Sequence, residues 1–326
     1  MVEDAPNRRI VTNTIALYFR SLIMLLIGLY TSRVFLNALG VTDYGIYNAV
    51  GGIVAMIGFV TASLGNASSR FITIAIGTGD EEFTKKTYGN IKVIYYGLSA
   101  LILLLGETVG LWFFYTYMNI PLERLHAGFW VYQFSVFSTA LGLICVPYTS
   151  SIIAHEKMKA FAYISLLDAG LKLLVCYLLY VIAFDRLVVY AALLFCVANI
   201  SRLAYSIYSK RHFSEVRAKA TLYRSQFREI LTLSGWSMAS DMLYMGYTQG
   251  LNILLNIFFG PVVNAARGIV LQVQTALNLF VSNFQTATNP QITKSYALNN
   301  LDRMRFLFRF ESKLSFFLMN VRKLPI

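Results

Sequence analysis

Charged residues are scarce in this chain. Asp, Glu, Lys and Arg make up 13% of its 326 residues, against roughly a quarter in soluble globular domains. Apolar residues reach 57%, and the mean hydropathy is +0.58. So little charge argues against a soluble domain and favours a chain that folds within a lipid bilayer.

The sequence also lacks the patterns of common catalytic and metal sites. It shows no Gly-rich phosphate loop, no paired catalytic carboxylates and no metal-ligand spacing. The cysteines all fall inside apolar stretches and are interpreted as small buried hydrophobic residues: Cys145, Cys176 and Cys196. The histidines fall in predicted loops and are interpreted as solvated: His126, His155 and His212. We therefore predict no enzymatic activity, no metal and no cofactor.

Acidic residues are the rarer of the two charge types, 16 against 28 basic ones, so the net charge is +12. A nucleic-acid partner is not expected, because no basic face is interleaved with stacking aromatic residues. The basic residues gather instead in alternate segments between apolar stretches, as they do in membrane proteins whose positive loops stay in the cytoplasm.

Apolar stretches of about 20 residues are long enough to cross a bilayer as helices. The sequence contains eight of them and the start of a ninth near Phe306. The eight predicted spans are 12–36, 44–64, 91–117, 129–153, 161–184, 187–208, 230–259 and 261–289. This pattern predicts an all-α polytopic transmembrane bundle.

The basic loops fix the predicted orientation. The N-terminus carries Arg8 and Arg9, the loop after the second span carries Arg70, and the longest basic segment follows the sixth span. The opposite loops hold little beyond Arg124 and Arg186. The positive-inside rule therefore places the N-terminus in the cytoplasm, which in a bacterium makes this a multi-pass inner-membrane protein.

The spans divide into two unequal groups. We predict a six-helix lobe over 1–210, a basic cytoplasmic linker over 211–228 and a partial second lobe over 229–326. A faint repeat relates the second and eighth spans, and paired repeats are a common plan in transporters. The ninth apolar stretch stops abruptly, so we expect a truncated or frameshifted chain whose second lobe is incomplete.

Ionisable residues inside the spans are candidate functional residues, because charge is costly at membrane depth. Arg20 lies too deep in the first span to reach the surface easily. Arg33 is near the outer end, where snorkelling to the interface is an alternative. Asp168 and Lys172 are four residues apart, which places them on one helix face. They are either a structural ion pair or a site for a coupling ion or proton.

Two later spans carry polar stripes. In the eighth span, steps of seven, four and seven residues keep Arg267, Gln274, Asn278 and Gln285 on one helix face. The seventh span carries a similar stripe that includes Asp241 and Asn252. Such amides cannot face lipid unpaired, so they either bond between helices or line a hydrated cavity. If the stripe lines a hydrated cavity, Arg267 would need an anionic partner, which is either a ligand or Asp241.

Two segments resemble a known family. Residues 33–47, RVFLNALGVTDYGIY, look like the first outer turn of polysaccharide (O-antigen type) flippases. Residues 264–269 and 283–296 are similar to the eighth span of the same proteins, which belong to the multidrug/oligosaccharidyl-lipid/polysaccharide exporter superfamily. The resemblance implies two lobes around a central cavity, which flips undecaprenyl-diphosphate-linked oligosaccharides for surface polysaccharide or lipopolysaccharide synthesis.

The resemblance also implies roles for particular residues. Related flippases are thought to hold the diphosphate with arginines of the first, second and eighth helices. Arg20 and Arg267 lie in the corresponding helices, whereas 46–64 has no Lys or Arg. The expected substrate-binding residues are Arg20, Arg33, Arg267, Gln274, Asn278, Gln285, Asp241 and Asn252. The expected partners are the anionic lipid-linked oligosaccharide, membrane lipids and polysaccharide assembly proteins.

Three other functions remain open at this point. A cation-coupled drug or solute antiporter of the same fold would favour a carboxylate-lined cavity. A membrane polymerase or glycosyltransferase would need a large outer loop or an acidic catalytic motif. An inactive fragment would follow from the abrupt end of the chain.

Overall fold

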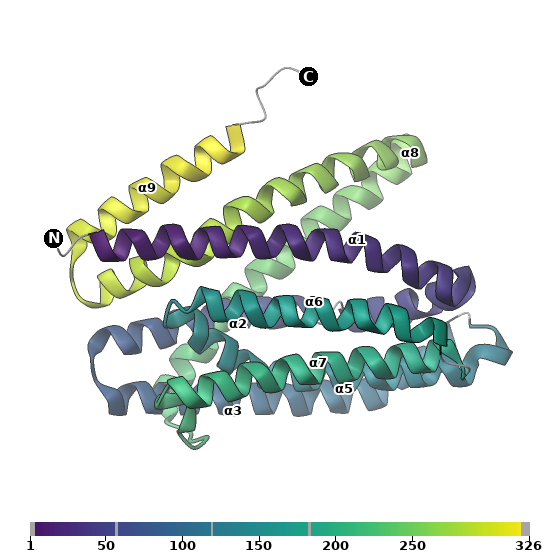
Figure 1. Ribbon diagram of the computed structural model, residues 1–326, viewed down its shortest axis with the longest axis horizontal. Coiled ribbons are helices and arrows are strands. Elements are labelled where there is room, and N and C mark those ends of the chain that lie inside the picture. The colour runs from purple at the N-terminus through teal and green to yellow at the C-terminus, as the bar shows by residue number, and fades with distance from the viewer. Residues whose placement is uncertain (1–3, 56–57, 119, 182–183, 321–326) are drawn as a thin grey trace.

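The computed structural model is helical throughout the part of the chain that it describes, which is residues 4–55, 58–118, 120–181 and 184–320. Within these ranges the side chains of 4–9, 41, 52–55, 58–63, 225, 238, 245, 248–250, 252–257, 259–273, 275–277, 280 and 318–320 lie outside the description. Figure 1 shows most helices running along the long axis of the molecule. The prediction of an all-α bundle is confirmed.

The first helix reverses direction at a glycine. Helix α1 (Asp4–Ala55) is broken at Gly40, whose φ of 79° and ψ of 169° are non-helical. Glycine adopts a positive φ without the steric cost that other residues meet. The segment after Gly40 runs back along the bundle, and α2 (Gly58–Thr78) continues in the same direction. The predicted outer turn between the first two spans is therefore present.

The next helices complete a first group of packed spans. A long composite helix consists of α3 (Glu81–Leu105), the π-helix η1 (Gly106–Gly110) and α4 (Leu111–Tyr117). It is followed by the short η2 (Leu122–Arg124), α5 (Leu125–Ala154), α6 (Met158–Val181) and α7 (Arg186–His212). Helix α5 packs against α2, α3 and α7, and α6 packs against α1 and α7.

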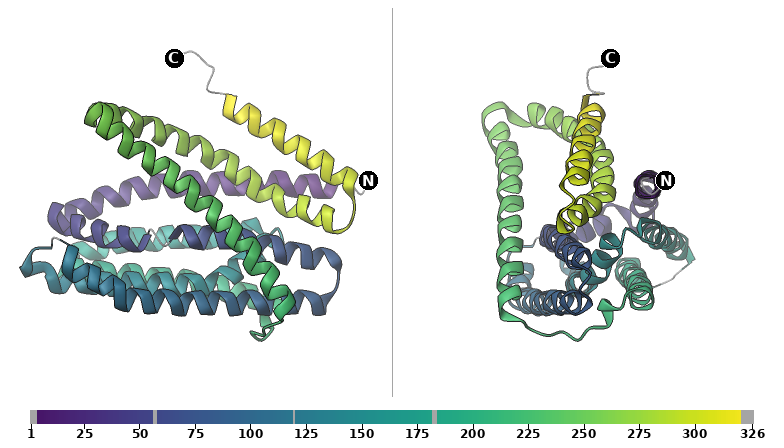
Figure 2. Two further views of the ribbon diagram at one scale, coloured as in Figure 1. Left: turned by 180° about the vertical axis from the view of Figure 1, so that it is seen from behind. Right: turned by 90° about the vertical axis from the view of Figure 1, so that its left-hand side faces the viewer.

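The remaining helices stand on one side of this group. The short η3 (Glu215–Arg217) leads into α8 (Arg224–Ala297), and α9 (Leu301–Asn320) follows. Figure 2 shows that α8 runs out along the bundle and then turns back, so it consists of two arms. These two arms occupy the positions of the predicted seventh and eighth spans.

Five helices among the described residues are long and apolar enough to cross a membrane, and they correspond to the first, third, fourth, fifth and sixth predicted spans. The predicted spans 44–64, 230–259 and 261–289 fall partly on side chains outside the description. Several predicted boundaries were wrong, among them the start of the third span, where α3 begins at Glu81 rather than at residue 91. Helix α2 continues to Thr78, well past residue 64, and α9 begins at Leu301 rather than near Phe306.

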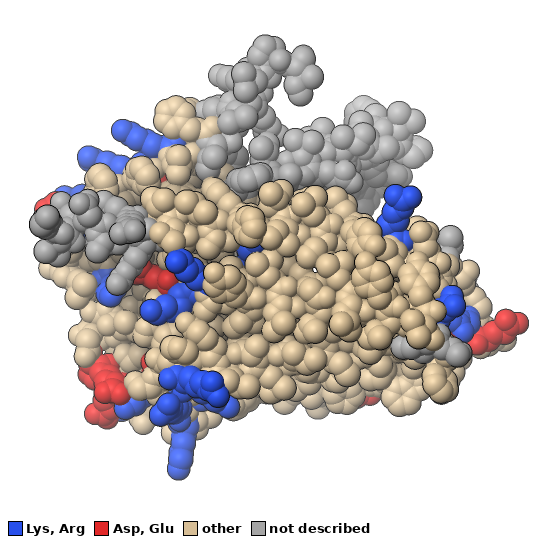
Figure 3. All heavy atoms as spheres, in the orientation of Figure 1, with Lys and Arg blue, Asp and Glu red and all other residues tan. Residues whose placement is uncertain are grey.

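The surface agrees with a bilayer environment. On the face shown in Figure 3, Lys, Arg, Asp and Glu gather mainly toward the two ends of the long axis, and a broad band between them is largely free of charge. Large apolar side chains are exposed on the helices, among them Leu26 and Leu29 of α1 and Tyr177 of α6. The chain is therefore a multi-pass membrane protein.

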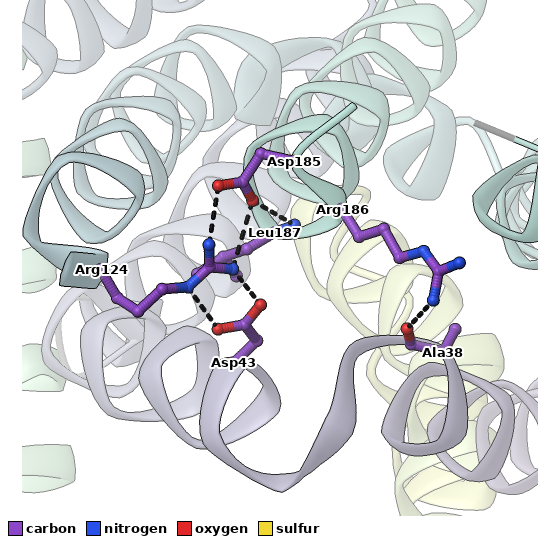
Figure 4. A network of polar contacts seen from close by, with 6 residues as sticks. All are labelled: Ala38, Asp43, Arg124, Asp185, Arg186 and Leu187. Atoms are coloured by element: carbon purple, nitrogen blue, oxygen red, sulfur yellow. Dashed lines mark hydrogen bonds and ion pairs between the residues drawn. The ribbon is translucent and has the colours of Figure 1, made fainter. Parts of the chain in front are cut away.

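We call the end of the bundle that carries the Gly40 turn the outer end and the opposite end the inner end, after the predicted orientation. At the outer end, one arginine ties three segments together (Figure 4). Arg124 donates from Nε to Asp43 Oδ1 at 2.8 Å and from Nη1 to Asp185 Oδ2 at 2.8 Å, and its Nη2 also contacts both carboxylates. Arg186 donates to the carbonyl oxygen of Ala38 at 3.1 Å. Both of these outer arginines hold the turn around Gly40 in place.

The linker between α7 and α8 is fastened to the inner end of the bundle. Lys92 Nζ donates to the carbonyl oxygens of Val216 and Ala218 at 2.7 and 2.8 Å. His155 contacts the buried carboxylate of Glu215 at 2.7 Å and stacks on Phe213. The interpretation of His155 as a solvated residue was therefore wrong: its ring is held between an acid and an aromatic side chain.

Candidate functional site

A cavity of about 630 Å³ lies between α2 and both arms of α8. Helix α2 contributes residues from 66 to 74, the first arm of α8 contributes Leu233 and Ser237, and the second arm contributes residues from 282 to 296. The polar side chains that line it are Asn66, Ser69, Arg70, Thr73, Ser237, Ser282, Gln285, Thr286, Asn289, Thr293 and Tyr296. The site thus lies between the six-helix group and α8.

The lining is rich in neutral hydrogen-bonding groups and carries one kind of charge. Arg70 is the one charged residue among the described residues that line the cavity, and they include no Asp or Glu. Amide and hydroxyl groups both donate and accept hydrogen bonds, and a guanidinium binds phosphate or carboxylate oxygens in a bidentate manner. The cavity is therefore suited to a ligand that combines hydroxyl groups with an anion.

Arg70 was missed as a site residue by the sequence analysis. Its assignment to a loop after the second span was wrong, because α2 extends to Thr78 and carries Arg70 in its middle third. The apolar run ends near residue 64, so hydropathy alone placed the end of the helix too early. The mixed polar pattern Asn66, Ser69, Arg70 and Thr73 has helical spacing, and this spacing was the available clue.

The polar stripe of the second arm of α8 has different surroundings along its length. Gln285 lines the cavity. Gln274 and Asn278 are half-buried and do not appear among the lining residues. The side chains of Arg267 and Asn252 lie outside the described residues. Of the remaining candidates, Asp241 on the first arm and Arg33 on α1 are both exposed.

Arg20 faces a neighbouring helix rather than the cavity. Its Nη1 lies 3.5 Å from Ser165 Oγ, and its guanidinium carbon lies 5.0 Å from the centre of the Phe161 ring, both on α6. Its Nε is buried without a hydrogen-bond partner. In this conformation the structure does not bring Arg20 to the same cavity as Arg70.

Asp168 and Lys172 form an ion pair, with Lys172 Nζ 2.7 Å from Asp168 Oδ2. The other carboxylate oxygen accepts a hydrogen bond from Ser201 Oγ at 2.9 Å. Arg202 lies near the predicted cytoplasmic end of the sixth span, but its guanidinium bonds Ser138 and Asn199 inside the bundle. Of the cysteines, Cys145 and Cys176 are buried as predicted, but Cys196 is exposed on α7.

Several described contacts join the second arm of α8 to the preceding helices. Asn283 Nδ2 donates to Ser21 Oγ at 2.7 Å. Closer to the inner end, Gln291 Nε2 donates to Glu156 Oε2 at 3.0 Å. At the last turn, Gly77 of α2 lies directly against Ala297. The inner ends of α2 and α8 are therefore in contact.

The fold places the chain in a structural class. No family model and no curated protein matches the sequence. Solved structures are similar to it: a MATE in the bent conformation, with a TM-score of 0.82 at 16% identity, and an outward-facing multidrug resistance MATE family transporter of the MOP superfamily, with a TM-score of 0.81 at 16% identity. A MOP superfamily transporter from Pyrococcus furiosus has a TM-score of 0.80 at 14% identity.

Each of these three alignments covers 96% of this chain and 70% of the solved chain. At such low identity the likeness establishes the fold alone. The chain therefore shares the helical fold of these solved transporters over about 70% of their length.

Proposed function

We propose that this protein is a flippase that moves an undecaprenyl-diphosphate-linked oligosaccharide across the bacterial inner membrane. Such transport would serve O-antigen, lipopolysaccharide or other surface polysaccharide synthesis. The observation that carries the proposal is the lining of the cavity, in which neutral amides and hydroxyls surround Arg70 without a carboxylate among the described residues. The amides and hydroxyls would bond sugar hydroxyl groups, and Arg70 would bind the diphosphate.

Arg70 supplies an arginine on α2, the helix that continues the second predicted span past its apolar part, residues 46–64, which has no Lys or Arg. With Arg70, the first, second and eighth spans each carry an arginine, together with Arg20 and Arg267. Because Arg20 contacts α6 in this conformation, we assign the direct diphosphate contact to Arg70 and Arg267. Gln285 would then meet the sugar, and Gln274 and Asn278 would follow it along the second arm of α8.

A drug antiporter is the second candidate, because two of the similar structures are MATE transporters and one is described as a multidrug resistance transporter. Cationic drugs need a carboxylate to neutralise their charge once water is removed. The described part of the lining offers Arg70 instead, which repels such ligands. Asp241 is exposed and is not among the lining residues.

Transport of this kind also needs an energy source, and the protein must have a defined orientation in the membrane. We propose that Asp168 and Lys172 belong to an ion site that couples to the movement of the lobes. The N-terminus is proposed to lie in the cytoplasm, as the distribution of basic residues indicates. Polysaccharide assembly proteins are then the expected protein partners on the outer side.

The proposal is tested by binding to the purified chain in lipid nanodiscs, with two probes of opposite charge. One probe is an undecaprenyl-diphosphate oligosaccharide, and the other is tetraphenylphosphonium. The wild-type protein should bind the diphosphate lipid and show little affinity for the cation. Arg70→Ala should weaken diphosphate binding by about tenfold or more, because a hydrogen-bonded charge contributes about 1.5–3 kcal/mol.

Arg211, an exposed residue at the inner end of α7, provides the matched control. Arg211→Ala removes the same charge outside the cavity and should leave binding unchanged. Arg20→Ala should have a smaller effect than Arg70→Ala. Preferential binding of tetraphenylphosphonium by the wild-type protein would contradict the flippase proposal and favour the drug antiporter.

A further inference from the structure

A second pocket, of about 300 Å³, lies between helices of the first group and is open on one side. Its walls come from α1, α5, α6 and α7, and it does not share a described lining residue with the cavity at α8. The outer walls are aromatic and aliphatic, with Phe134, Leu194 and Phe195. Its polar groups are Tyr47, Ser135, Ser138, Thr139 and Lys172.

The charges around this pocket do not cancel. Lys172 lines it directly, and Arg202 reaches it through Ser138, whose Oγ accepts a hydrogen bond from Arg202 Nη2 at 2.8 Å. The other Arg202 contact is also neutral, from Nη1 to Asn199 Oδ1 at 3.1 Å. Asp168 is the one carboxylate that the described contacts bring to this group. Two cations and one anion leave one positive charge at membrane depth, which calls for an anion.

The carboxylate is turned away from the pocket. One oxygen of Asp168 is occupied by Lys172 and the other by Ser201, and Asp168 is not among the described residues that line the pocket. A metal cation or a hydronium ion in the pocket would therefore meet an ammonium group and hydroxyl groups. This arrangement does not suit a cation.

Among the serine and threonine hydroxyl groups of the pocket, one offers its hydrogen to a ligand. Ser135 and Thr139 donate to the carbonyl oxygens of Val131 and Ser135 at 2.8 and 2.9 Å, so their hydrogens are used. Ser138 accepts from Arg202, and its own hydrogen is left to donate. A guanidinium that donates to this hydroxyl makes it a stronger donor. The Lys172 ammonium and the Ser138 hydroxyl together form a pair of anion-binding donors.

We propose that this pocket binds a small monovalent anion of the chloride class, held by Lys172 and Ser138 with Arg202 behind them. This inference deepens the ion-coupling part of the proposed function and names the ion as an anion. It does not depend on the identity of the transported lipid. The test measures binding without transport, so its failure is distinguishable from failure of the flippase proposal.

The experiment follows the thermal unfolding of the full chain in detergent, with sodium chloride replacing sodium gluconate at constant ionic strength. A ligand that binds the folded state alone raises the midpoint with a saturable dependence on its concentration. We expect such a rise with chloride. Lys172→Gln should abolish it, and Ser138→Ala should weaken the apparent affinity by about tenfold.

Asp168→Asn separates an anion site from a cation site. It adds one net positive charge and frees Lys172, so an anion should bind more tightly than in the wild-type protein. A proton or sodium site centred on the carboxylate would be lost in the same variant. If Lys172→Gln folds poorly because Asp168 loses its partner, the double variant Asp168→Asn/Lys172→Gln keeps the pair neutral and should still lose the chloride effect.

Lys157→Gln is the matched control, because Lys157 is an exposed lysine in the turn between α5 and α6. It should keep the full chloride response. Equal unfolding midpoints in chloride and gluconate would overturn the proposal. A chloride response that disappears in Asp168→Asn would also overturn it, because the site as proposed should bind the anion more tightly in that variant.

Discussion

Gly77 and Ala297 are in such close contact that a Cβ atom at position 77 would lie 2.7 Å from the Cβ of Ala297. Neither group can rotate away, so Gly77→Ala must push the inner ends of α2 and α8 apart. We expect this variant to favour a form that is open toward the cytoplasm. In a cysteine-free background, a cysteine at Ser69 in the cavity should then react several-fold faster with an impermeant thiol reagent from the inner side.

Gly28→Ala makes the same chemical change on α1, at a glycine whose added Cβ would meet no atom within 4 Å. Its reaction rate should equal that of the parent protein. Equal rates in Gly77→Ala as well would show that this contact does not control access to the cavity.

Gln291 and Glu156 provide a polar fastening near the same end. Gln291→Leu should destabilise the form in which the inner ends of α2 and α8 are in contact. The reason is that the Glu156 carboxylate loses a hydrogen bond, which contributes about 1.5–3 kcal/mol for a charged acceptor. The same labelling assay measures the change. Ser240→Ala, which removes a hydroxyl bonded only within α8 in the described contacts, serves as the comparison and should not alter the rate.

Lys92 is expected to be the most sensitive charged residue of the inner surface. It is 8% exposed and donates to two carbonyl oxygens of the linker. Lys92→Met should lower the free energy of unfolding by about 2–3 kcal/mol, since one buried and one half-buried carbonyl oxygen lose their donor. Lys86→Met, which breaks an exposed pair with Glu82, should lie within the error of the wild-type value. Unfolding by heat in detergent gives the comparison.

The two carboxylates at Arg124 should differ in importance. The side chain of Asp43 is 15% exposed and that of Asp185 is 40% exposed, so the Asp43 contact is less screened by water and salt. Asp43→Asn should lower the unfolding temperature more than Asp185→Asn does. At 1 M salt the unfolding temperatures of the two variants should lie closer together, because salt screens electrostatic contacts near the surface.

The orientation has its own test. A single cysteine at Lys210 should be labelled only after an impermeant reagent is given access to the cytoplasm, whereas a cysteine at Glu123 should be labelled in intact spheroplasts. The reverse pattern would place the basic loops outside and would refute the proposed topology.

The sequence predicted the helices well where apolar length alone decides them. Five spans follow from hydropathy, and the outer turn follows from Gly40, because a positive φ is what glycine permits. Hydropathy failed at α2, where a polar helix end continues beyond the apolar run to Thr78. Hydropathy cannot show this end, because the packing of α2 against α8 is what makes a polar helix favourable there. The helical spacing of the polar residues was the signal that could have shown it.

The site was less accessible to sequence reasoning than the fold. The pairing of Asp168 with Lys172 follows from a separation of four residues, which one helix satisfies by itself. The bonds of Arg202 to Ser138 and of Lys92 to Val216 join residues that are 64 and 124 positions apart. Such contacts depend on which helices are neighbours, and one sequence does not contain that information.

Hydrogen bonds to α3 fix the position at which α8 begins. The side chain of Asn90, which is fully buried, accepts from the backbone N–H of Tyr223 at 2.7 Å and donates to Gln226 at 3.2 Å. The first turn of α8 is therefore tied to α3, while its far end is not held by these bonds. At 1.5 Å per residue the predicted span 230–259 is about 45 Å long, so a pivot of about 10° at its base would carry its outer end by roughly 8 Å. A small rotation at Asn90 thus becomes a large displacement at the opposite face of the membrane.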